Sequence, residues 1–593
     1  MCGINAVVSF SGIEDSDREL VHCMNREMVY RGPDGSGIWS DNTVCLGAVR
    51  LAIIGVGNGQ QPITNETGNV VLVCNGEIYN YQELKESLIG SGHVFKTDTD
   101  IEVLVHLYEE RGIQFVSHIK GMFAFAIYDS ANRCLIFGRD RLGEKPLYYS
   151  QQFGKIIVSS EAKAIAINCD QEVSIDDSVL LNTNYCSYPQ DPRRTLYREI
   201  KRVAPGEYIT VGLSSLTRSR YWNGRRNSTY AGTLDDAILE ATKLLKQAVQ
   251  RTMISDVPVA ILLSGGIDSS AIAAIAKSQT KQLQAISVGY EGCSRLDERS
   301  VARRLANDLG IVLHEIELTK RDFIDCFDKY FEYLDEPIWD PASVMQWYIF
   351  KRAREIGLKV LLNGQASDEL FFGYPSELIA ARHFEGLKKI STYLPVGRRG
   401  IRLFLRDLFR SPRLMFRLLR TPSNGEWVSR NLASLNDVDY SLPEGVFWAY
   451  VHSGDNPLES RFNFNREVYL PTNGFLQTDK LSMAHSCEVR SPFADADLVD
   501  FIQSLPQSFL VGDFEPKWFL KKALAGIVPD YILNLPKQGF QPSDECLHAL
   551  TKKFTSDENY WIPMTKEVTQ RILKNICDRR SEKRKRKSLI AVP

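Results

Sequence analysis

Short apolar runs separated by turns dominate the first 210 residues of the chain. Such runs, bounded by glycine, asparagine and aspartate, are typical of β-strands. Two stretches differ, 16–31 and 100–112, because their apolar residues recur at spacings near three and four, which predicts helices. We therefore expect layers of sheet and helix in this half. The predicted strands lie in segments 3–10, 44–54, 69–80, 123–129, 134–140, 155–161 and 206–211.

The pattern changes in the second half to apolar runs that alternate with helical segments. The run 257–263 is continuously apolar after Pro258 and feeds an alanine-rich helical stretch through a Ser-Gly-Gly turn. Alternation of buried strands with helices predicts a parallel sheet covered by helices. Further strands are expected at 283–290, 311–318 and 359–362, with a helix at 297–310, and the chain to about 550 reads mostly as amphipathic helix.

A polar stretch, 223–233, separates the two halves and has no apolar period. Thr233 then reads as a helix N-cap, with Asp236 three residues on, before an amphipathic helix. We predict two large domains, 2–215 and 236–555, joined by a linker at 216–235 and followed by an extension, 556–593, with a basic tail.

Composition narrows the class of protein. The chain has 593 residues, 44% of them hydrophobic, and a net charge of -2, which argues against nucleic acid or a membrane as a partner. No apolar run approaches the roughly 18 residues of a membrane span. The start lacks a basic, apolar leader, and the 12 cysteines show no metal-binding spacing. A cytoplasmic location is expected, and we allow for a homodimer.

Cys2 is the first candidate catalytic residue. After removal of Met1, Cys2 would carry a thiol and an α-amine on one residue, so nucleophile and base stand together. The α-amine has a pKa of about 7.7 to 8.0, which lets it take a proton from the thiol near neutral pH.

Four polar clusters interrupt the strands of the first half: RGPDGSG (31–37), RLAI (50–53), NGEIYN (75–80) and TDTDIE (97–102). Glycine, arginine, asparagine and aspartate at strand ends are typical of a compact polar pocket. This part of the chain resembles the glutaminase domain of class II glutamine amidotransferases. The resemblance lies in the order and spacing of MCGI, the first three of these clusters, GMFAFAIYD and GRDRLGEKPLYY.

That resemblance implies an α+β N-terminal-nucleophile hydrolase fold, an αββα sandwich, that hydrolyses glutamine to glutamate and ammonia. Cys2 matches the nucleophile that forms a thioester. The oxyanion hole would be the side chain of Asn75 and the backbone N–H of Gly76. Arg50 and Asp100 match the residues that hold the α-carboxylate and α-amine of glutamine, and Glu77 would assist.

The loop SGGIDSS (264–270) joins a predicted strand to a helix, an arrangement that directs backbone N–H groups and a helix dipole at one point. It lacks the lysine of a Walker A loop. It resembles the pyrophosphate loop of N-type ATP pyrophosphatases. The nucleotide-binding residues implied are Leu263, Ser264, Gly265, Gly266, Asp268, Ser269, Ser270, Val288, Asn363 and Gly364.

The chain resembles glutamine-dependent asparagine synthetases over all but the last 40 or so residues. The motifs that carry this resemblance follow the glutaminase half and are SGGIDSS, SDELFFGY, DKLSMAHSCEVRSPF and KQGF. The resemblance implies an α/β domain with a parallel sheet and a helical C-terminal part. In that family aspartate attacks the α-phosphorus of ATP, and ammonia passing through a channel displaces AMP. Mg²⁺ accompanies ATP in that family, and Asp268 and Asp368 are its candidate ligands here. Lys537 would stabilise the negative charge that develops during the reaction. No tightly bound cofactor is expected.

The loop 363–369 departs from the family pattern. It reads NGQASDE where typical synthetases resemble SGEGSDE, so Gln365 replaces a glutamate and Ala366 a glycine, next to Asp368 and Glu369. An amide cannot act as a general base. The acceptor is therefore aspartate or another carboxylate, such as a sugar uronate of a surface polysaccharide precursor. A non-catalytic binding protein is disfavoured because Cys2 and the phosphate loop are intact.

The last 13 residues include a dense basic run, SEKRKRKS (581–588). A nuclear address or a patch for an anionic surface would fit this composition. A solvated, disordered end is the expected state.

Overall fold

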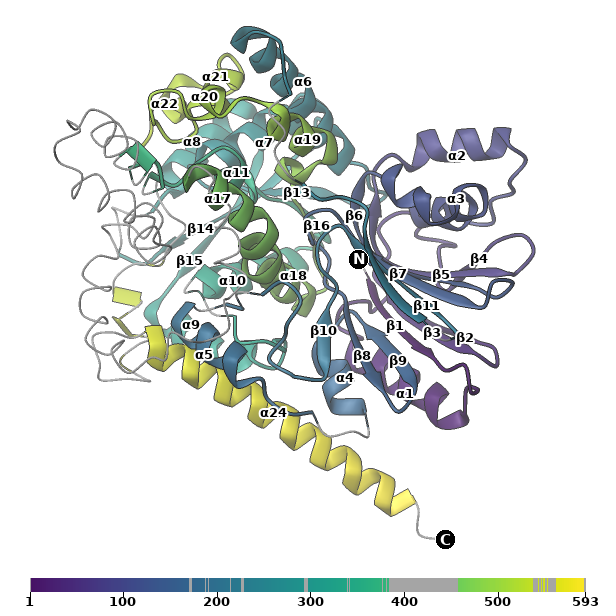
Figure 1. The fold of residues 1–593 in the computed structure, drawn as a ribbon. Coiled ribbons are helices and arrows are strands. Elements are labelled where there is room, and N and C mark those ends of the chain that lie inside the picture. Colours follow the sequence, from purple (N-terminus) through teal and green to yellow (C-terminus); the bar gives the residue numbers. More distant parts are fainter. Residues whose placement is uncertain are drawn as a thin grey trace, which may run out of the picture.

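A computed structural model gives the fold (Figure 1). It describes residues 2–382, 457–536 and 561–590, with isolated positions between 542 and 552 and short gaps at 170–172, 187, 190, 214, 225–228, 293–296, 339, 341, 376 and 380. Lys537, the candidate lysine of the late motif, lies outside the described residues.

Two six-stranded antiparallel sheets form the first half of the chain. Their inner faces share one apolar core, which includes Ile4, Ala6 and Leu46 from one sheet and Val73 and Phe137 from the other. The first sheet has the order β10 (Ile200–Arg202), β8 (Tyr148–Gln152), β9 (Lys155–Ser159), β1 (Cys2–Val8), β3 (Val44–Arg50), β2 (Gly35–Ser40); the second has the order β12 (Ser215–Arg220), β11 (Glu207–Gly212), β7 (Cys134–Arg139), β6 (Gly121–Asp129), β5 (Val70–Ile78), β4 (Ile63–Thr64).

Helices cover the outer faces of this pair of sheets (Figure 1). Helices α1 (Asp15–Glu27) and α4 (Ala162–Asn168) pack on the sheet that contains β1, while α2 (Tyr81–Gly90) and α3 (Val103–Arg111) lie over the sheet that contains β5. The αββα sandwich expected from the sequence is thus the observed fold.

A five-stranded parallel sheet organises the second half. Its order is β15 (Val312–Leu318), β14 (Gln284–Tyr290), β13 (Val259–Leu262), β16 (Val360–Leu362), β17 (Glu488–Arg490). The connection leaves β13 toward β14 on one side and returns to β16 on the other, so the strand order reverses between β13 and β16. Ligands of open parallel sheets bind at such a reversal.

The helices of the second half pack on both faces of this sheet (Figure 1). Thr233 caps α6 as the sequence predicted, because its hydroxyl accepts from the backbone N–H of Asp236 and the Asp236 carboxylate returns to the N–H of Thr233. The principal helices are α6 (Leu234–Thr252), α7 (Ile267–Lys277), α8 (Arg299–Leu309), α9 (Lys320–Tyr330), α10 (Ala342–Glu355), α17 (Pro457–Phe464), α18 (Phe475–Ala484) and α19 (Ala496–Ser504).

A buried ionic network joins the two halves. Arg31 of the first half contacts Glu161 and Asp479, and Lys480 contacts Glu161 and Asp335, at distances of 2.5 to 3.1 Å between charged atoms. All five side chains are essentially inaccessible to water. Removing one partner of such a network leaves a buried charge, at a cost of about 3–5 kcal/mol.

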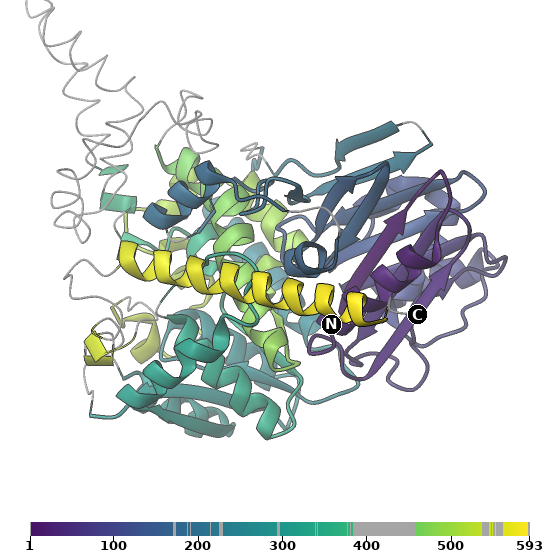
Figure 2. The same ribbon diagram turned by 90° about the horizontal axis from the view of Figure 1, so that it is seen from below.

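The basic end of the chain is helical, which corrects the expectation of a disordered tail. Helix α24 (Trp561–Ile590) runs across both halves (Figure 2). Arg580 donates to the carbonyls of Ala166 and Cys169, and Lys583 donates to the carbonyl of Asn168. These carbonyls end α4, where the helix dipole attracts cations. No helix of the described residues is long and apolar enough to cross a membrane.

Candidate active sites

Cys2 begins β1, at the edge of the sandwich nearest to the second half. Its backbone N lies 2.9 Å from Asn75 Oδ1, and Gln61 Nε2 lies 3.3 Å from its Sγ. Pairing of β1 with β3 places Arg50 directly opposite Cys2. Burial raises the pKa of the Cys2 thiol, so a base must take its proton before sulfur can attack.

Asn75 and Gly76 lie side by side at the end of β5. The Oδ1 of Asn75 is engaged by Cys2, whereas its Nδ2 is buried and has no hydrogen-bond partner among the described residues. A Cβ at Gly76 would lie 2.1 Å from the carbonyl of Met122, so only glycine fits. A buried, unused amide donor beside a nucleophile suits a developing oxyanion.

Arg50 and Asp100 are both buried but are held differently. Arg50 donates to the carbonyls of Ile54 and Gly55 at 3.1 and 2.7 Å. Asp100 accepts from the backbone N–H of Ile78 at 2.6 Å, and burial raises its pKa to about 6. A buried guanidinium opposite Cys2 and a buried carboxylate at the end of β5 match the two charges of an amino acid.

Glu77 does not face the glutaminase site alone, because the guanidinium of Arg490 on β17 contacts it at 3.2 Å. Burial raises the pKa of Glu77 well above its usual value, and the nearby carboxylates of Glu488 and Asp100 raise it further. Glu77 thus belongs to a charge cluster shared by both halves of the protein.

The SGGIDSS loop lies between β13 and α7, with Gly266 as the N-cap of the helix. Ser264 Oγ and Ser269 Oγ are 3.0 Å apart, and the backbone N–H of Gly266 donates to Ser264 Oγ. The serine hydroxyls therefore make hydrogen bonds within the loop itself. The predicted members lie together: Leu263 is buried behind the loop, Ser270 caps back to the carbonyl of Gly266, and Gly265 contacts Glu298. Val288 is half-buried on the neighbouring strand β14.

The loop 363–369 follows β16 and touches the phosphate loop. A Cβ at Gly364 would lie 2.6 Å from Asp268 Cβ, and Ser367 Oγ donates to Asp268 Oδ1 at 2.7 Å. Ala366 has a φ of 73°, a left-handed conformation that costs a residue with a Cβ about 1–2 kcal/mol. A glycine, which the family pattern SGEGSDE has at this position, would adopt the same conformation without that cost.

Asn363, Gln365 and Glu369 of the same loop make different contacts. Asn363 Oδ1 accepts from Ser491 Oγ at 2.8 Å, and its Nδ2 is 3.4 Å from Gln365 Oε1. Glu369 accepts from Tyr374 Oη at 2.5 Å, and burial raises its pKa to about 7.

Lys517 lies between the two aspartates, a contact that the sequence did not reveal. Its Nζ is 2.5 Å from Asp268 Oδ2 and 2.7 Å from Asp368 Oδ1, and its side chain is 3% exposed. The carboxylates of Asp268 and Asp368 therefore both contact the ammonium group of Lys517. Oxygen ligands with this convergence fit Mg²⁺, which Asp268 and Asp368 would hold with phosphate oxygens once Lys517 shifts.

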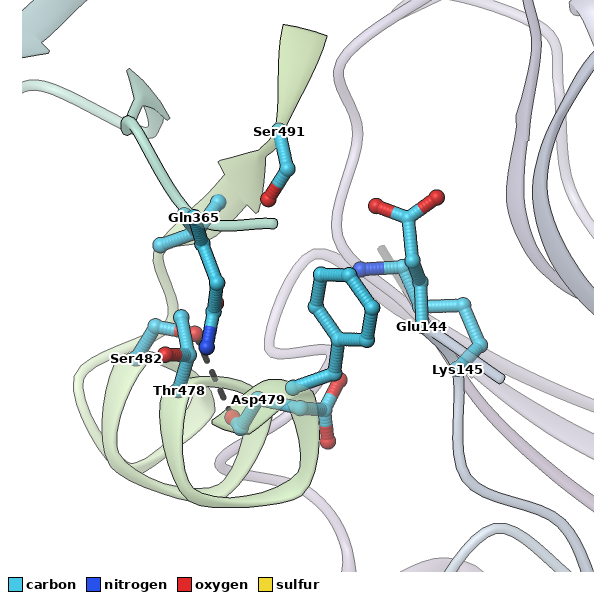
Figure 3. A pocket seen from close by; sticks show the side chains of 9 residues that line it. Glu144, Lys145, Gln365, Thr478, Asp479, Ser482 and Ser491 are labelled. Carbon is cyan, nitrogen blue, oxygen red and sulfur yellow. Dashed lines mark hydrogen bonds between the residues drawn. The ribbon is translucent and has the colours of Figure 1, made fainter. Parts of the chain in front are cut away.

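A small cavity lies between the halves (Figure 3). Glu144 and Lys145 enter it from the first half and Gln365 from the second, while Ser491 follows β17. Burial raises the pKa of Glu144 well above its usual value, and Asp140 raises it further. One face of α18 completes the wall with Phe475, Thr478, Asp479 and Ser482.

Sequence reasoning missed three residues of these sites: Gln61 at the thiol, Arg31 and Lys517. Arg31 Nε donates to the carbonyl of Cys2 at 3.2 Å, while its Nη1 reaches Asp479 of the cavity. RGPDGSG was recognised as a polar cluster, but no periodic signal links Arg31 to a residue 448 positions away.

Comparisons with known proteins agree with this arrangement. A glutamine amidotransferase domain model matches residues 1–222, and the model of asparagine synthase matches residues 240–589. The second match includes most of the last 40 or so residues, which lie outside the resemblance inferred from the motifs.

Three similar proteins illustrate the range of names and sequence identities among the relatives. Asparagine synthetase [glutamine-hydrolyzing] 1 of Bacillus subtilis is 32% identical over 91% of this chain and 87% of its own. Asparagine synthetase [glutamine-hydrolyzing] 3 of the same organism is 29% identical over 98% of this chain and 92% of its own. Amidase chry2 of Gibberella zeae is 26% identical over 91% of this chain and 88% of its own.

Fold, paired sites and these matches define an ATP-dependent ligase that hydrolyses glutamine. The chain belongs to the asparagine synthase family.

Proposed function

We propose that the protein transfers the amide nitrogen of glutamine to the β-carboxylate of aspartate, giving asparagine, glutamate, AMP and pyrophosphate. The observation that carries this proposal is the cavity lined by Glu144 and Lys145 of the first half and Gln365 of the second. Its lining combines residues of the glutaminase half with the loop 363–369, which supports the passage of ammonia from one half to the other.

The first half supplies the glutaminase. Cys2, freed of Met1, attacks the glutamine carboxamide after its α-amine takes the thiol proton. Asn75 Nδ2 and the N–H of Gly76 receive the oxyanion that forms, and a donor of this kind is worth about 10²- to 10³-fold in rate. Arg50 and Asp100 hold the α-carboxylate and α-ammonium of glutamine, with Glu77 beside them, and water then releases glutamate from the thioester.

The second half supplies the ligase. Residues 264–266, 269 and 270 bind the pyrophosphate of ATP, while Leu263, Val288, Asn363 and Gly364 border the nucleotide. Mg²⁺ supplies charge neutralisation of the phosphates when bound. Lys517, and Lys537 of the late motif, offset negative charge that develops as the carboxylate displaces pyrophosphate.

The most specific part of the proposal is the identity of the carboxylate that accepts the nitrogen. Gln365, with Asp368 and Glu369, belongs to the loop that borders the acceptor, and an amide there presents no charge. Since relatives include proteins named amidases, a second candidate keeps both half reactions but amidates another carboxylate, such as a uronate.

Amide-¹⁵N glutamine, ATP, Mg²⁺ and aspartate, incubated with the purified protein, test both candidates. Labelled asparagine formed in equal amount to AMP supports the first. Glutamate without AMP removes aspartate as the acceptor, and other carboxylates are then screened for AMP release. Cys2→Ala serves as the control, because it is expected to abolish transfer from glutamine while leaving synthesis from ammonium salts intact.

A further inference from the structure

Four side chains of the first half, remote in sequence from the predicted site residues, converge on one point. Glu66 lies in the turn between β4 and β5, His93 follows α2, and His106 and Glu109 share one face of α3 because they are three residues apart. One ligand atom from each lies within 4.8 Å of the other three.

The distances between the two imidazoles and the two carboxylates are close to the edges of a tetrahedral metal centre. His106 Nδ1 lies 3.3 Å from Glu66 Oε2 and 3.5 Å from Glu109 Oε2, while His93 Nδ1 lies 3.3 Å from Glu66 Oε1 and 3.8 Å from Glu109 Oε2. Zinc bonds of about 2.0–2.2 Å to nitrogen and oxygen give tetrahedral edges of about 3.3–3.6 Å. Three of the four distances fall in that range, and His93 faces one oxygen of Glu66 while His106 faces the other.

His106 provides an independent observation. Its side chain is 1% exposed, and neither ring nitrogen has a hydrogen-bond partner among the described residues. Leaving a buried polar group unsatisfied costs about 1–3 kcal/mol. Its Nδ1 is aimed at the two carboxylates, so a cation bound between them would satisfy it.

The carboxylates that face the two imidazoles are fixed by further contacts. Asn65 Nδ2 donates to Glu109 Oε1 at 2.7 Å, and the backbone N–H of Val94 donates to Glu66 Oε1 at 2.8 Å. Hydrogen bonds of this kind orient the ligands of metal centres.

The second nitrogen of each imidazole also faces a carboxylate. His106 Nε2 is 3.7 Å from Glu102 Oε1, and His93 Nε2 is 3.7 Å from Glu110 Oε1. Glu102 is itself held by the backbone N–H groups of Lys96 and Thr97, both at 2.7 Å. A carboxylate behind a histidine ligand is typical of zinc sites.

We propose that Glu66, His93, His106 and Glu109 form a tetrahedral zinc site of the glutaminase half, separate from its chemistry. Two imidazoles and two carboxylates suit Zn²⁺, and four protein ligands leave no open position for substrate, which is the composition of a structural site. Bound zinc would tie the β4–β5 turn to α2 and α3, and α3 follows directly on the 3₁₀ turn Asp100–Glu102.

The test uses the full chain, stripped with a chelator, dialysed against Zn²⁺ and assayed by elemental mass spectrometry. The wild type is expected to retain one zinc per chain and to melt at higher temperature with zinc. His93→Gln and Glu109→Gln, both partly exposed positions, are expected to lose both effects, and His22→Gln on the exposed face of α1 is the matched control.

Cobalt gives a second readout. Co²⁺ bound to the wild type is expected to show the intense visible bands of tetrahedral coordination, which His93→Gln removes. Zinc retained equally by His93→Gln and Glu109→Gln would place the metal elsewhere, at Asp268 and Asp368 or at a thiol, and overturn the proposal. No retained metal, with a melting temperature that responds to pH but not to zinc, would show protonated histidines paired with the carboxylates instead.

Discussion

The guanidinium of Arg490 contacts the carboxylate of Glu77 at 3.2 Å, and the backbone carbonyl of the same Arg490 accepts from the N–H of Asn363 at 3.0 Å. One residue of β17 therefore contacts both the glutaminase cluster and the loop beside the phosphate site. Arg490 is fully buried, and it also donates to Glu488 at 2.6 Å.

Arg490→Lys is expected to weaken glutamine binding selectively. A lysine ammonium cannot reach Glu77 and Glu488 with the geometry of a guanidinium fork. Loss of the charged hydrogen bond to Glu488, about 1.5–3 kcal/mol, lets the neighbouring ion pair with Glu77 shift and predicts a rise of roughly tenfold or more in KM for glutamine. Synthesis from ammonium salts should stay within about twofold, because the backbone bond to Asn363 remains. Equal losses in both assays would contradict this, and Arg303→Lys on the surface is the control.

Lys517→Met is expected to expose the repulsion between Asp268 and Asp368. Removing the buried cation leaves two carboxylates facing one another and should lower stability by about 3–5 kcal/mol. Because Mg²⁺ can replace the lost charge, millimolar Mg²⁺ should raise the melting temperature of the variant more than that of the wild type. Lys521→Met, one turn further on α21 (Trp518–Ala523), is the control. An equal response to Mg²⁺ in both proteins would separate these aspartates from the metal.

Glutamine hydrolysis is expected to fall below pH 6. Burial raises the pKa of Asp100 to about 6, so the carboxylate that pairs with the glutamine ammonium is increasingly protonated below that pH. Protonation of the Cys2 α-amine already lowers kcat/KM for glutamine below about pH 8, and protonation of Asp100 should add a second factor of about ten per pH unit below pH 6. This second fall should appear in kcat at lower pH because bound substrate stabilises the ionised form. Asp100→Asn should lack this second fall, and a wild-type profile that does not steepen below pH 6 would contradict the assignment.

Local sequence was enough to predict much of this protein. The Thr233 cap and the parallel sheet of the second half follow from signals within a few residues of each element. The positions of Gln61, Arg31 and Lys517 depend on how distant segments pack, and no spacing encodes that. The zinc ligands were missed for the same reason.

The basic tail shows the opposite failure, in which composition misled. A run of lysines and arginines indicates a solvated end when considered alone. In the structure, Arg580 and Lys583 bind carbonyls at the C-terminal end of α4, where unpaired acceptors and the helix dipole favour positive charge. The carbonyls that Arg580 and Lys583 contact lie 414 and 415 positions away in the sequence, where composition cannot indicate them.

The cavity between the halves needs a group that can take a proton, because ammonium cannot attack an acyl group until it loses one. Gln365 cannot do so. Of the two lining carboxyls, Asp479 is bound through both oxygens by Arg31. Glu144 remains, and burial, which raises its pKa well above its usual value, makes its ionised carboxylate a stronger base.

Glu144→Gln is therefore expected to leave glutamate release intact while lowering AMP formed per glutamate by about tenfold or more, within the usual 10²- to 10⁴-fold contribution of general-base catalysis. Restoring a carboxylate from the opposite wall with Gln365→Glu should recover much of the loss in the double variant, because both side chains line the same cavity. The ratio of labelled product to glutamate measures this directly. Unchanged coupling in Glu144→Gln, or a double variant no better than the single one, would assign proton removal to bulk water rather than to the cavity wall.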